Sequence, residues 1–414
     1  MERYSEYKDS GVQWLGEIPS HWELLKMKYA FKERSEKNHP NEEPLCATQS
    51  RGVIPQSLYE GRVVVVNKGF EGLKLVKVGD FVISLRSFQG GIEYAYYQGI
   101  ISAAYTVLQP KESDMAPYFK YMFKSHDYIQ LLQTCVTGIR EGQNINYPLL
   151  AKKAVPIPPM EEQHAIVSYL DTKCSKLDTF ISNKEKEITL LQEMKQRVIA
   201  DAVTRGLNPN VKFKPTNISW LPEIPEHWKM SKVSSHFRQR NEKVSDKKYS
   251  PLSVSKIGIT PQLDNVALSN AEGNSRKLVK VGDYAVNSRS DRKGSCGVSD
   301  YEGSVSLITI VLEPFDIDGG YVHYLFRSSP WVEEFYRNGR GIVADLWTTN
   351  YQMMKGMYLP VPSIEEQHAI VSYITERVAK IDSLIEKLNK EIECIKEYKQ
   401  RLISDVVTGQ IKVS

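Results

Sequence analysis

The residues best suited to acid–base chemistry are carboxylates and histidines that lie close together in a segment that occurs twice. The two groups are Glu161, Glu162 and His164, and Glu365, Glu366 and His368. A carboxylate beside an imidazole can transfer protons in catalysis. Both groups, however, lie beside the apolar seam at the start of a heptad pattern, where polar flanking residues are expected. We therefore interpret these residues as polar helix flanks and as candidate contacts with a partner protein.

Short motifs for other kinds of catalysis are missing. The sequence has no phosphate-binding loop, no glycine-rich dinucleotide fingerprint, no H-E-x-x-H and no G-x-S-x-G. The N-P-P-[FY] tetrapeptide of amino-methyltransferases is also missing, and the five cysteines show no C-x-x-C spacing. We therefore expect no catalytic residue, no metal site and no cofactor in this chain.

The elements that carry these groups belong to two copies of one unit. EEQHAIVSYL at 161–170 returns as EEQHAIVSYI at 365–374, an offset of 204 residues. Further matching pairs are WLGEIPSHW and WLPEIPEHW at 14–22 and 220–228, and YFKYMFKS and YVHYLFRS at 118–125 and 321–328. Self-similarity at a fixed period indicates a duplicated structural unit.

A long helix is predicted at the end of each copy. The segments 160–204 and 364–408 contain neither glycine nor proline, and carboxylates occupy the first turn of each. Gly206 and Gly409 are predicted to end the helices, because glycine readily adopts the left-handed conformation found there. At about 1.5 Å per residue, each helix would span roughly 65 Å.

A heptad repeat of apolar positions runs through both helices and is typical of a coiled coil. Its two seam positions include Val167, Leu170, Cys174, Ile181 and Leu191 in the first helix, and Val371, Ile374, Ile385, Leu388 and Leu402 in the second. Each helix has one domain before it and another after it. Antiparallel pairing is therefore favoured over parallel pairing, with the domains at opposite ends and related by a pseudo-two-fold axis. The N-terminal segment would then dock against the end of the second helix.

The remaining segments are predicted to form two mixed α/β domains, so the fold class is α+β. In the first copy, β-rich runs at 63–67, 80–85 and 101–108 precede a helical run at 118–133, and the second copy repeats this order. The predicted parts are a first globular domain at 1–155, a helical spacer at 156–209, a second globular domain at 210–360 and a helical spacer at 361–414.

Charge is distributed unevenly along the chain. The net charge is +4, with +2 over residues 1–155, +4 over residues 210–360 and −1 in each helical spacer. Such an excess is only a weak indication of nucleic-acid binding, because strongly basic binding domains carry far more. With no signal peptide and no apolar run of twenty residues in the sequence, we expect a cytoplasmic protein.

Together these motifs resemble the specificity subunit of type I restriction-modification systems. The resemblance rests on W-L-G-E-I-P-x-H-W, the P-I-P-P-x-E-E-Q helix start, the K-Q-x-x-I-x-x-x-V-T-x-G helix end and S-F-Q-G-G, and it covers both halves of the chain. It implies two target-recognition domains that each read half of a bipartite, asymmetric double-stranded DNA site. It also implies two modification subunits that bind S-adenosylmethionine and methylate adenine, together with restriction subunits that use ATP and Mg.

Polar and basic residues in loops that match between the copies are the candidates for DNA contacts. In the first domain they are Ser50, Arg51, Arg86, Ser87, Gln89, Arg140, Gln143 and Asn144. In the second domain they are Lys256, Arg289, Ser290, Arg292, Lys293 and Arg340. Arginine can pair with guanine, asparagine and glutamine with adenine, and lysine usually meets phosphate. For each residue, an ordinary solvated surface position is the alternative. The tryptophans of the W-L-x-E-I-P-x-H-W segments are interpreted as packing anchors.

Two functions of other classes stay open at this point. A two-headed coiled-coil scaffold that links protein partners would explain the helices, but not the positive charge confined to the globular domains. A self-sufficient methyltransferase or nuclease is disfavoured by the missing catalytic motifs.

Overall fold

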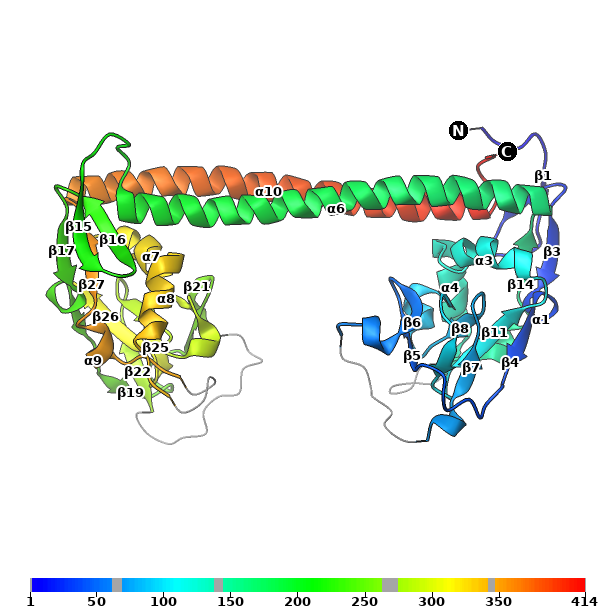
Figure 1. The fold of residues 1–414 in the computed structure, drawn as a ribbon, viewed down its shortest axis with the longest axis horizontal. Helices are drawn as coiled ribbons and strands as arrows, with labels where there is room; N and C mark the ends of the chain where they lie inside the picture. Colours follow the sequence, from blue (N-terminus) through cyan, green and yellow to red (C-terminus); the bar gives the residue numbers. More distant parts are fainter. Residues whose placement is uncertain (1, 62–68, 138–143, 263–274, 342–346, 414) are drawn as a thin grey trace. The chain divides into compact units, whose positions relative to one another are not determined.

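The computed structural model describes residues 2–61, 69–137, 144–262, 275–341 and 347–413 (Figure 1). The chain divides into two compact units, one made of Met1–Lys184 and Asn389–Ser414 and the other of Glu185–Leu388. Each unit combines a mixed α/β domain with part of α6 (Met160–Arg205) and part of α10 (Ile364–Val407). The predicted α+β fold with two long helices is confirmed.

The long helices begin and end close to the predicted residues. Gly206 and Gly409 follow them with φ angles of 75° and 77°, so both ends use the left-handed conformation that glycine tolerates without strain. At the start of α10 the Ser363 hydroxyl accepts a hydrogen bond from the Glu366 amide at 3.3 Å. The absence of glycine and proline therefore located both helices correctly.

In each unit the two helices pack side by side and antiparallel. In the first unit, Lys399 of α10 contacts the Asp178 carboxylate of α6 at 2.6 and 2.7 Å. In the second unit, Lys195 of α6 contacts the Asp382 carboxylate of α10 at 2.7 and 2.8 Å. The beginning of each helix thus meets the end of the other. The predicted antiparallel pairing is confirmed within each unit.

The first domain is built around an antiparallel sheet with the strand order β4-β11-β8-β9 within the described residues. Its described strands are β1 (Tyr7–Asp9), β2 (Glu17–Pro19), β3 (Glu23–Lys26), β4 (Phe31–Arg34), β5 (Leu45–Thr48), β6 (Gly52–Pro55), β7 (Lys74–Val76), β8 (Phe81–Ile83), β9 (Glu93–Tyr94), β10 (Gly99–Ile101), β11 (Thr106–Pro110), β12 (Val136–Thr137), β13 (Asn144–Ile145) and β14 (Ala154–Ile157). Its described helices are α1 (Met27–Ala30), α2 (Ser87–Gly90), α3 (Ala116–Met122), α4 (His126–Thr134) and α5 (Tyr147–Leu150).

The second domain repeats this architecture with the strand order β18-β26-β23-β24. Its described strands are β15 (Phe213–Ile218), β16 (Leu221–Pro225), β17 (Lys229–Lys232), β18 (Phe237–Gln239), β19 (Lys243–Val244), β20 (Leu252–Ser255), β21 (Gly258–Pro261), β22 (Arg276–Val279), β23 (Tyr284–Val286), β24 (Cys296–Val298), β25 (Gly303–Ser306), β26 (Ile310–Pro314) and β27 (Tyr358–Val361). Its described helices are α7 (Gly319–Arg327), α8 (Ser329–Arg337) and α9 (Tyr351–Met354).

Two of the predicted runs are divided in the structure. The run 101–108 contains the end of β10, a turn and the start of β11, and the helical run 118–133 is interrupted at Ser125 between α3 and α4. The buried Ser125 has an extended backbone, and its hydroxyl donates to the Met122 carbonyl at 2.7 Å. Ser328 makes the same contact with Leu325 at 2.7 Å. The strand predicted at 63–67 lies outside the described residues.

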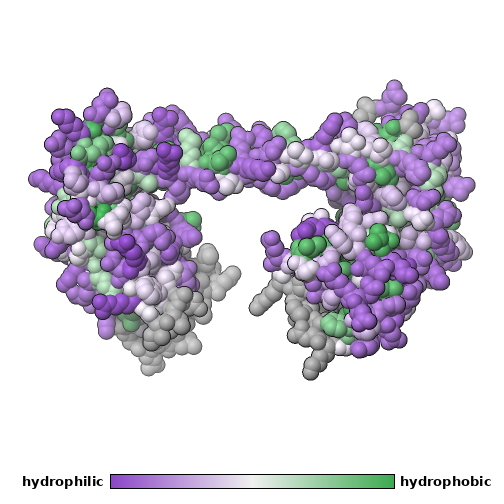
Figure 2. Space-filling view, in the orientation of Figure 1, coloured by the Kyte–Doolittle hydropathy of each residue, from purple (hydrophilic) through white to green (hydrophobic). Residues whose placement is uncertain are grey.

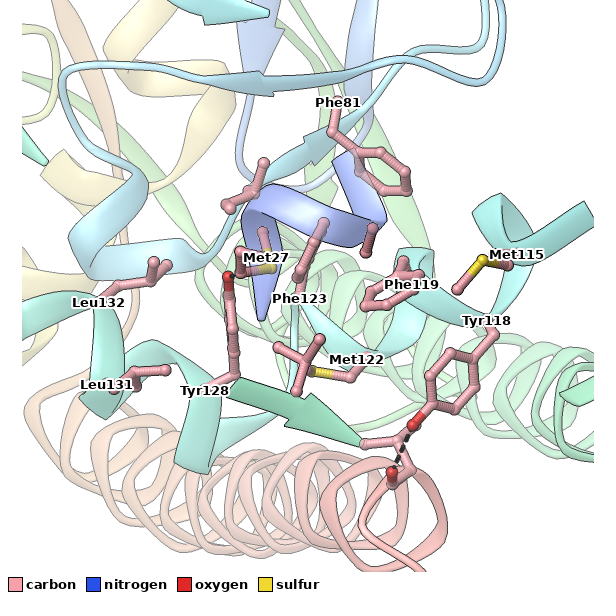
Figure 3. Close-up of a cluster of buried hydrophobic side chains, with 14 of the residues drawn as sticks. Met27, Phe81, Met115, Tyr118, Phe119, Met122, Phe123, Tyr128, Leu131 and Leu132 are labelled. Atoms are coloured by element: carbon pink, nitrogen blue, oxygen red, sulfur yellow. Dashed lines mark hydrogen bonds between the residues drawn. The ribbon is translucent and has the colours of Figure 1, made fainter. Parts of the chain in front are cut away.

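Each domain is anchored to the helices by one buried tyrosine. Tyr118 donates to the Val407 carbonyl at the end of α10 at 2.8 Å and approaches the Pro156 carbonyl at 3.3 Å (Figure 3). Tyr321 makes the matching contacts with Val203 at 3.1 Å and Pro360 at 3.0 Å. Around Tyr118, an aromatic and aliphatic core that includes Phe81, Phe119 and Phe123 fills the space between the sheet and α3. Because these contacts recur, the duplication extends to the interior of each unit.

A buried ion pair explains the V-G-D sequence that occurs at 78–80 and again at 281–283. The Arg34 guanidinium contacts the Asp80 carboxylate at 2.7 and 3.3 Å, and Arg240 contacts Asp283 at 2.6 and 3.1 Å. Asp80 also accepts the Lys77 amide at 2.8 Å, which closes the turn before β8. A buried charge requires such a partner and hydrogen bonds. The motif therefore has a structural role.

Candidate nucleic-acid interface

The turns that follow β5 and β20 hold the first candidates in each domain. Ser50 and Arg51 are exposed, and the Thr48 hydroxyl accepts the Arg51 amide at 3.1 Å. The Arg51 guanidinium donates to the Leu58 carbonyl at 3.0 Å, so part of its hydrogen-bonding capacity is already used. In the second domain the exposed Lys256 occupies the turn between β20 and β21. Both turns present polar or basic groups at a surface.

The loop after β8 contains one residue that differs from the expectation. Arg86 and Gln89 are exposed, as expected for contacts with a ligand. Ser87, however, is buried, and its hydroxyl accepts the Ser84 amide at 2.8 Å. Because this hydroxyl closes the turn from inside, we no longer propose Ser87 as a DNA contact. Asn144 in β13 is exposed, while Arg140 and Gln143 lie outside the described residues.

The corresponding loop after β23 is held in place by backbone pairing with Trp347 and Thr348. Thr348 pairs with Arg289 and with Arg340, so these two arginines from distant parts of the sequence are brought together. The Ser290 amide donates to the Trp347 carbonyl at 3.0 Å, which holds the loop against the same segment. The run of polar and basic residues at 288–295 predicts a flexible loop at this position. The turn is instead fixed by backbone hydrogen bonds at both sides.

The charged side chains of this loop differ in how they are paired. Arg289 binds the Asp291 carboxylate at 2.9 and 3.1 Å, and Lys293 binds the Glu333 carboxylate at 2.9 and 3.2 Å. Arg292 is exposed, and among the described residues no acid forms an ion pair with it. Exposed ion pairs contribute little stability and are easily exchanged. These cations therefore remain candidates for contacts with an anionic ligand.

Lys124 joins the two candidate loops of the first domain, although sequence reasoning did not select it. Its ammonium donates to the Gln49 carbonyl at 3.2 Å, the Gly90 carbonyl at 2.8 Å and the Glu93 carboxylate at 2.7 Å. Burial raises the pKa of Glu93 to about 7, while the charge of Lys124 acts against this rise. Burial also lowers the pKa of Lys124. A basic residue at the same place in both copies, Lys124 and Arg327, was the available signal.

In the two candidate partner-binding segments, Glu162 and Glu366 mainly make contacts within the chain. Glu162 accepts hydrogen bonds from the Trp22 indole at 3.0 Å and from Tyr4 at 2.8 Å, and it contacts His21. Glu366 accepts from the Trp228 indole at 2.9 Å and contacts His227 at 2.9 Å. Trp22 and Trp228 are fully buried. The interpretation of these tryptophans as packing anchors is confirmed, and these two glutamates are their acceptors.

The other four candidate residues of the two segments are exposed. Glu161, His164, Glu365 and His368 lie on the surface, and the His368 imidazole is 3.5 Å from the Asp318 carboxylate. These residues remain available to a partner. Glu162 and Glu366 are largely occupied within the chain and have a structural role, while their role as partner contacts stays a prediction.

The N-terminal segment docks at the end of α10, as predicted. Tyr7 donates to the Gly409 carbonyl at 2.9 Å, and Gln410 donates to the Glu17 carbonyl at 2.8 Å. A side chain at Gly409 would collide with Pro19, because an added Cβ would lie 2.4 Å from its ring. The W-L-x-E-I-P-x-H-W segment therefore bridges the start of one long helix and the end of the other. In the second unit, a Cβ added at Gly206 would lie 3.1 Å from the Trp228 ring.

Within the described residues, no helix combines the length and the apolar character that crossing a membrane requires. No group of three or more His, Cys, Asp or Glu side chains in the same residues is placed to hold a metal ion.

The sequence is similar to type I restriction specificity proteins. The family model of the type I restriction modification DNA specificity domain matches residues 22–190. A Methanocaldococcus jannaschii protein assigned as the MjaX type I restriction enzyme specificity subunit is 23% identical over 438 residues, covering 96% of each chain. The type I restriction enzyme EcoBI specificity subunit of Escherichia coli is 25% identical over 281 residues, covering 62% of this chain and 58% of that one.

Solved structures share the fold. One chain, from a study of complex assembly and conformational transition of the type I R-M system, matches with a TM-score of 0.68 and 13% identity, covering 95% of this chain and 99% of that chain. The HsdS subunit from Thermoanaerobacter tengcongensis matches with a TM-score of 0.50 and 14% identity, covering 95% and 98%. Together with the duplicated unit and the long helices, these sequence and fold matches make the chain similar to the specificity subunits of type I restriction-modification systems.

Proposed function

We propose that this chain is the DNA-recognition subunit of a type I restriction-modification complex and that it binds a bipartite, asymmetric double-stranded site. The observation that carries the proposal is a conserved framework with divergent loops. Both domains use the same strand order and the same buried tyrosine contacts. The loops at matching places differ, with S-F-Q-G-G at 87–91 and S-D-R-K-G at 290–294. Different loops on one framework read different half-sites.

The proposed division of labour assigns no catalytic step to this chain. Its role is to bind and orient DNA, while two modification subunits bind S-adenosylmethionine and methylate adenine. Restriction subunits that use ATP and Mg join that core. Phosphate contacts would fix the position of the duplex, and contacts with base edges would supply the sequence specificity.

The surface of the long helices supports docking of partner subunits. The exposed surface is mainly hydrophilic, but apolar groups remain visible on the helices (Figure 2). Phe180 and Tyr398 in the first unit, and Met194 and Leu384 in the second, are each 41–51% exposed. Phe180 matches Leu384 and Met194 matches Tyr398 at the repeat offset of 204. Matching apolar surfaces on both units suit two copies of one partner.

A selection experiment tests the proposal. The chain is produced with and without a co-expressed methyltransferase subunit and is incubated with a random double-stranded DNA library. Retarded DNA is then sequenced. We expect the assembled complex to enrich two unlike half-sites at a fixed separation. If the complex is assembled but enriches no bipartite sequence, the DNA-recognition proposal fails and a scaffold role replaces it.

A further inference from the structure

The second unit contains a basic groove. It has a volume of about 560 Å³ and lies where α6, α7, α8 and the turn between β20 and β21 meet. Its lining includes Lys256 and Lys293, together with His323 and Arg327 of α7. Two of these residues, Lys256 and Lys293, belong to the candidate DNA-contacting loops. The groove therefore connects to the surface already considered for DNA.

The positive charge in the groove is only partly neutralised. Lys195 is bound by Asp382, and Lys293 is bound by Glu333, which also lines the groove. Among the described residues, no acid pairs with Lys256 or Arg327. The polar contact recorded for the Arg327 side chain is with the His323 ring nitrogen, at 3.3 Å. A cation held by an imidazole rather than a carboxylate keeps its charge available to a ligand.

Two titratable neighbours of Arg327, His323 and Cys296, are neutral near pH 7. Burial, followed by the charge of Arg327, lowers the pKa of His323 to about 4, and Asp300 acts against this change. Burial raises the pKa of the nearby Cys296 thiol to about 11. An uncharged imidazole can accept a hydrogen bond from the guanidinium and so orient it. Neither neighbour cancels the charge.

The first unit neutralises the equivalent cation internally. Lys124 stands in the position of Arg327, since 118–125 matches 321–328. Glu93 lies opposite Val82 in the sheet, and the matching place opposite Ala285 is Gly297. The carboxylate that binds Lys124 at 2.7 Å is therefore missing from the second unit, because glycine has no side chain. Lys124 holds two loops together, while Arg327 faces a groove.

We propose that Arg327, assisted by Lys256, binds a backbone phosphate of the DNA in the second unit, whereas Lys124 positions loops in the first unit and does not bind phosphate. This inference rests on the proposed function. A guanidinium can bind two phosphate oxygens at once, which suits it to a fixed position on the duplex. The second domain would then contribute more to the salt dependence of binding than this part of the first domain.

The test compares variants of the assembled complex on its selected DNA site over a series of salt concentrations. Each phosphate contact that is lost should reduce the slope of log affinity against log salt by about 0.9. We expect Arg327→Met to weaken binding roughly tenfold, because a hydrogen bond between charged groups is lost. The substitution should also reduce the salt slope by the amount expected for one lost phosphate contact. Lys256→Met should reduce the slope in the same direction. Base preference should not change.

Three further variants give the test its controls. Arg238→Met removes an equal charge from an exposed arginine that lies over Phe315, and it should leave affinity and slope unchanged. Arg327→Lys should keep the salt slope of the wild type, because the charge remains, but should bind the DNA more weakly than the wild type. Lys124→Met should alter base preference in the first half-site while leaving the slope intact, because it releases the Gln49 and Gly90 carbonyls.

The possible failures are distinguishable. A wild-type complex that selects no bipartite site overturns the proposed function itself. If the wild-type complex selects a site but Arg327→Met and Lys256→Met both keep its salt slope, the phosphate inference alone is wrong. A drop in slope for Lys124→Met equal to that for Arg327→Met also contradicts it. If Arg327→Met does not fold, as judged by circular dichroism, the surface variant Lys256→Met decides the outcome.

Discussion

Individual side chains in the repeated motifs connect segments that are far apart in the chain. The Glu162 carboxylate at the start of α6 accepts a hydrogen bond from the buried Trp22 indole. The Glu366 carboxylate at the start of α10 accepts one from the Trp228 indole. Gln163 donates to the Pro158 carbonyl at 2.8 Å, and Gln367 donates to Pro362 at 3.0 Å. The E-E-Q sequence therefore fixes the entry of the chain into each long helix. Its repetition follows from this structural requirement.

Glu162→Gln tests this role at the level of a single residue. The substitution keeps the shape but removes the charge that strengthens the hydrogen bonds from Trp22 and Tyr4. We expect the free energy of unfolding at pH 7 to fall by about 1 kcal/mol. Urea unfolding followed by tryptophan fluorescence measures the change. Glu161→Gln is the matched control, because its exposed carboxylate should contribute much less. Equal effects of the two substitutions would contradict the assignment.

The effect of Glu162→Gln should depend on pH. Partial burial raises the pKa of Glu162, but hydrogen bonds from Trp22, Tyr4 and His21 outweigh it and leave the pKa below its ordinary value of 4.5. A depressed pKa means that this stabilisation is complete above pH 4.5 and is lost as pH falls through the lower folded-state value. The difference between the variant and the wild type should shrink over that range.

At the scale of the elements, one seam position of the coiled coil is a lysine in both helices, although most seam positions are apolar. Lys195 and Lys399 match at an offset of 204. Each reaches across to an aspartate on the other helix within its own unit. A charged residue at a seam position lowers stability but specifies register and orientation. The pairs therefore favour the antiparallel register.

Replacing both seam lysines with leucine tests this interpretation. The aspartates are more than half exposed, so the double variant Lys195→Leu/Lys399→Leu leaves no buried charge. We expect its thermal midpoint to rise, together with increased self-association in light scattering, because apolar area grows while register is less specified. The control Asp178→Asn/Asp382→Asn keeps the lysines and removes their partners, and should lower stability by about 0.5–1 kcal/mol per pair. A lower midpoint for the leucine variant would argue against this account.

At the scale of the whole molecule, the helices are proposed to set the number of unread base pairs between the half-sites. Deleting one heptad from each helix tests this, at 184–190 and 385–391, two segments that meet through the pair Lys184 and Glu391 at 3.2 Å. Seven residues correspond to about 10 Å of helix, or roughly three base pairs. We expect both half-sites to be unchanged and the spacer between them to be shorter.

Sequencing of methylated positions across the genome of a strain that carries the variant and its partner subunits measures the spacer. Deletion from one helix alone is the control, because it leaves seven seam residues without partners and should destabilise the coiled coil. A changed half-site sequence in the double deletion would contradict the proposal that the helices set the spacer length. An unchanged spacer would do the same.

How far the sequence predicted the structure depended on whether the signal was local. The bounds of α6 and α10 follow from local features, namely a heptad pattern, missing glycine and proline, and a glycine at each end. The break at Ser125 was missed, because α3 and α4 share one continuous helical pattern. The burial of Ser87 was missed, because the Ser84 turn that it closes leaves no trace in composition. The other predicted DNA contacts remain predictions.

By itself, the sequence determined the duplication, the α+β class, the two long helices and the family resemblance, because repeats and periodic patterns are written along the chain. Only the tertiary structure decided which basic side chains lack a carboxylate partner and so remain available to an anionic ligand. It placed Glu93 beside Lys124 and a glycine at the matching place near Arg327, a difference that depends on sheet register. It also assigned Glu162 and Glu366 to buried tryptophans about 140 residues away. Such pairings depend on how distant segments pack, and spacing along the chain does not encode them.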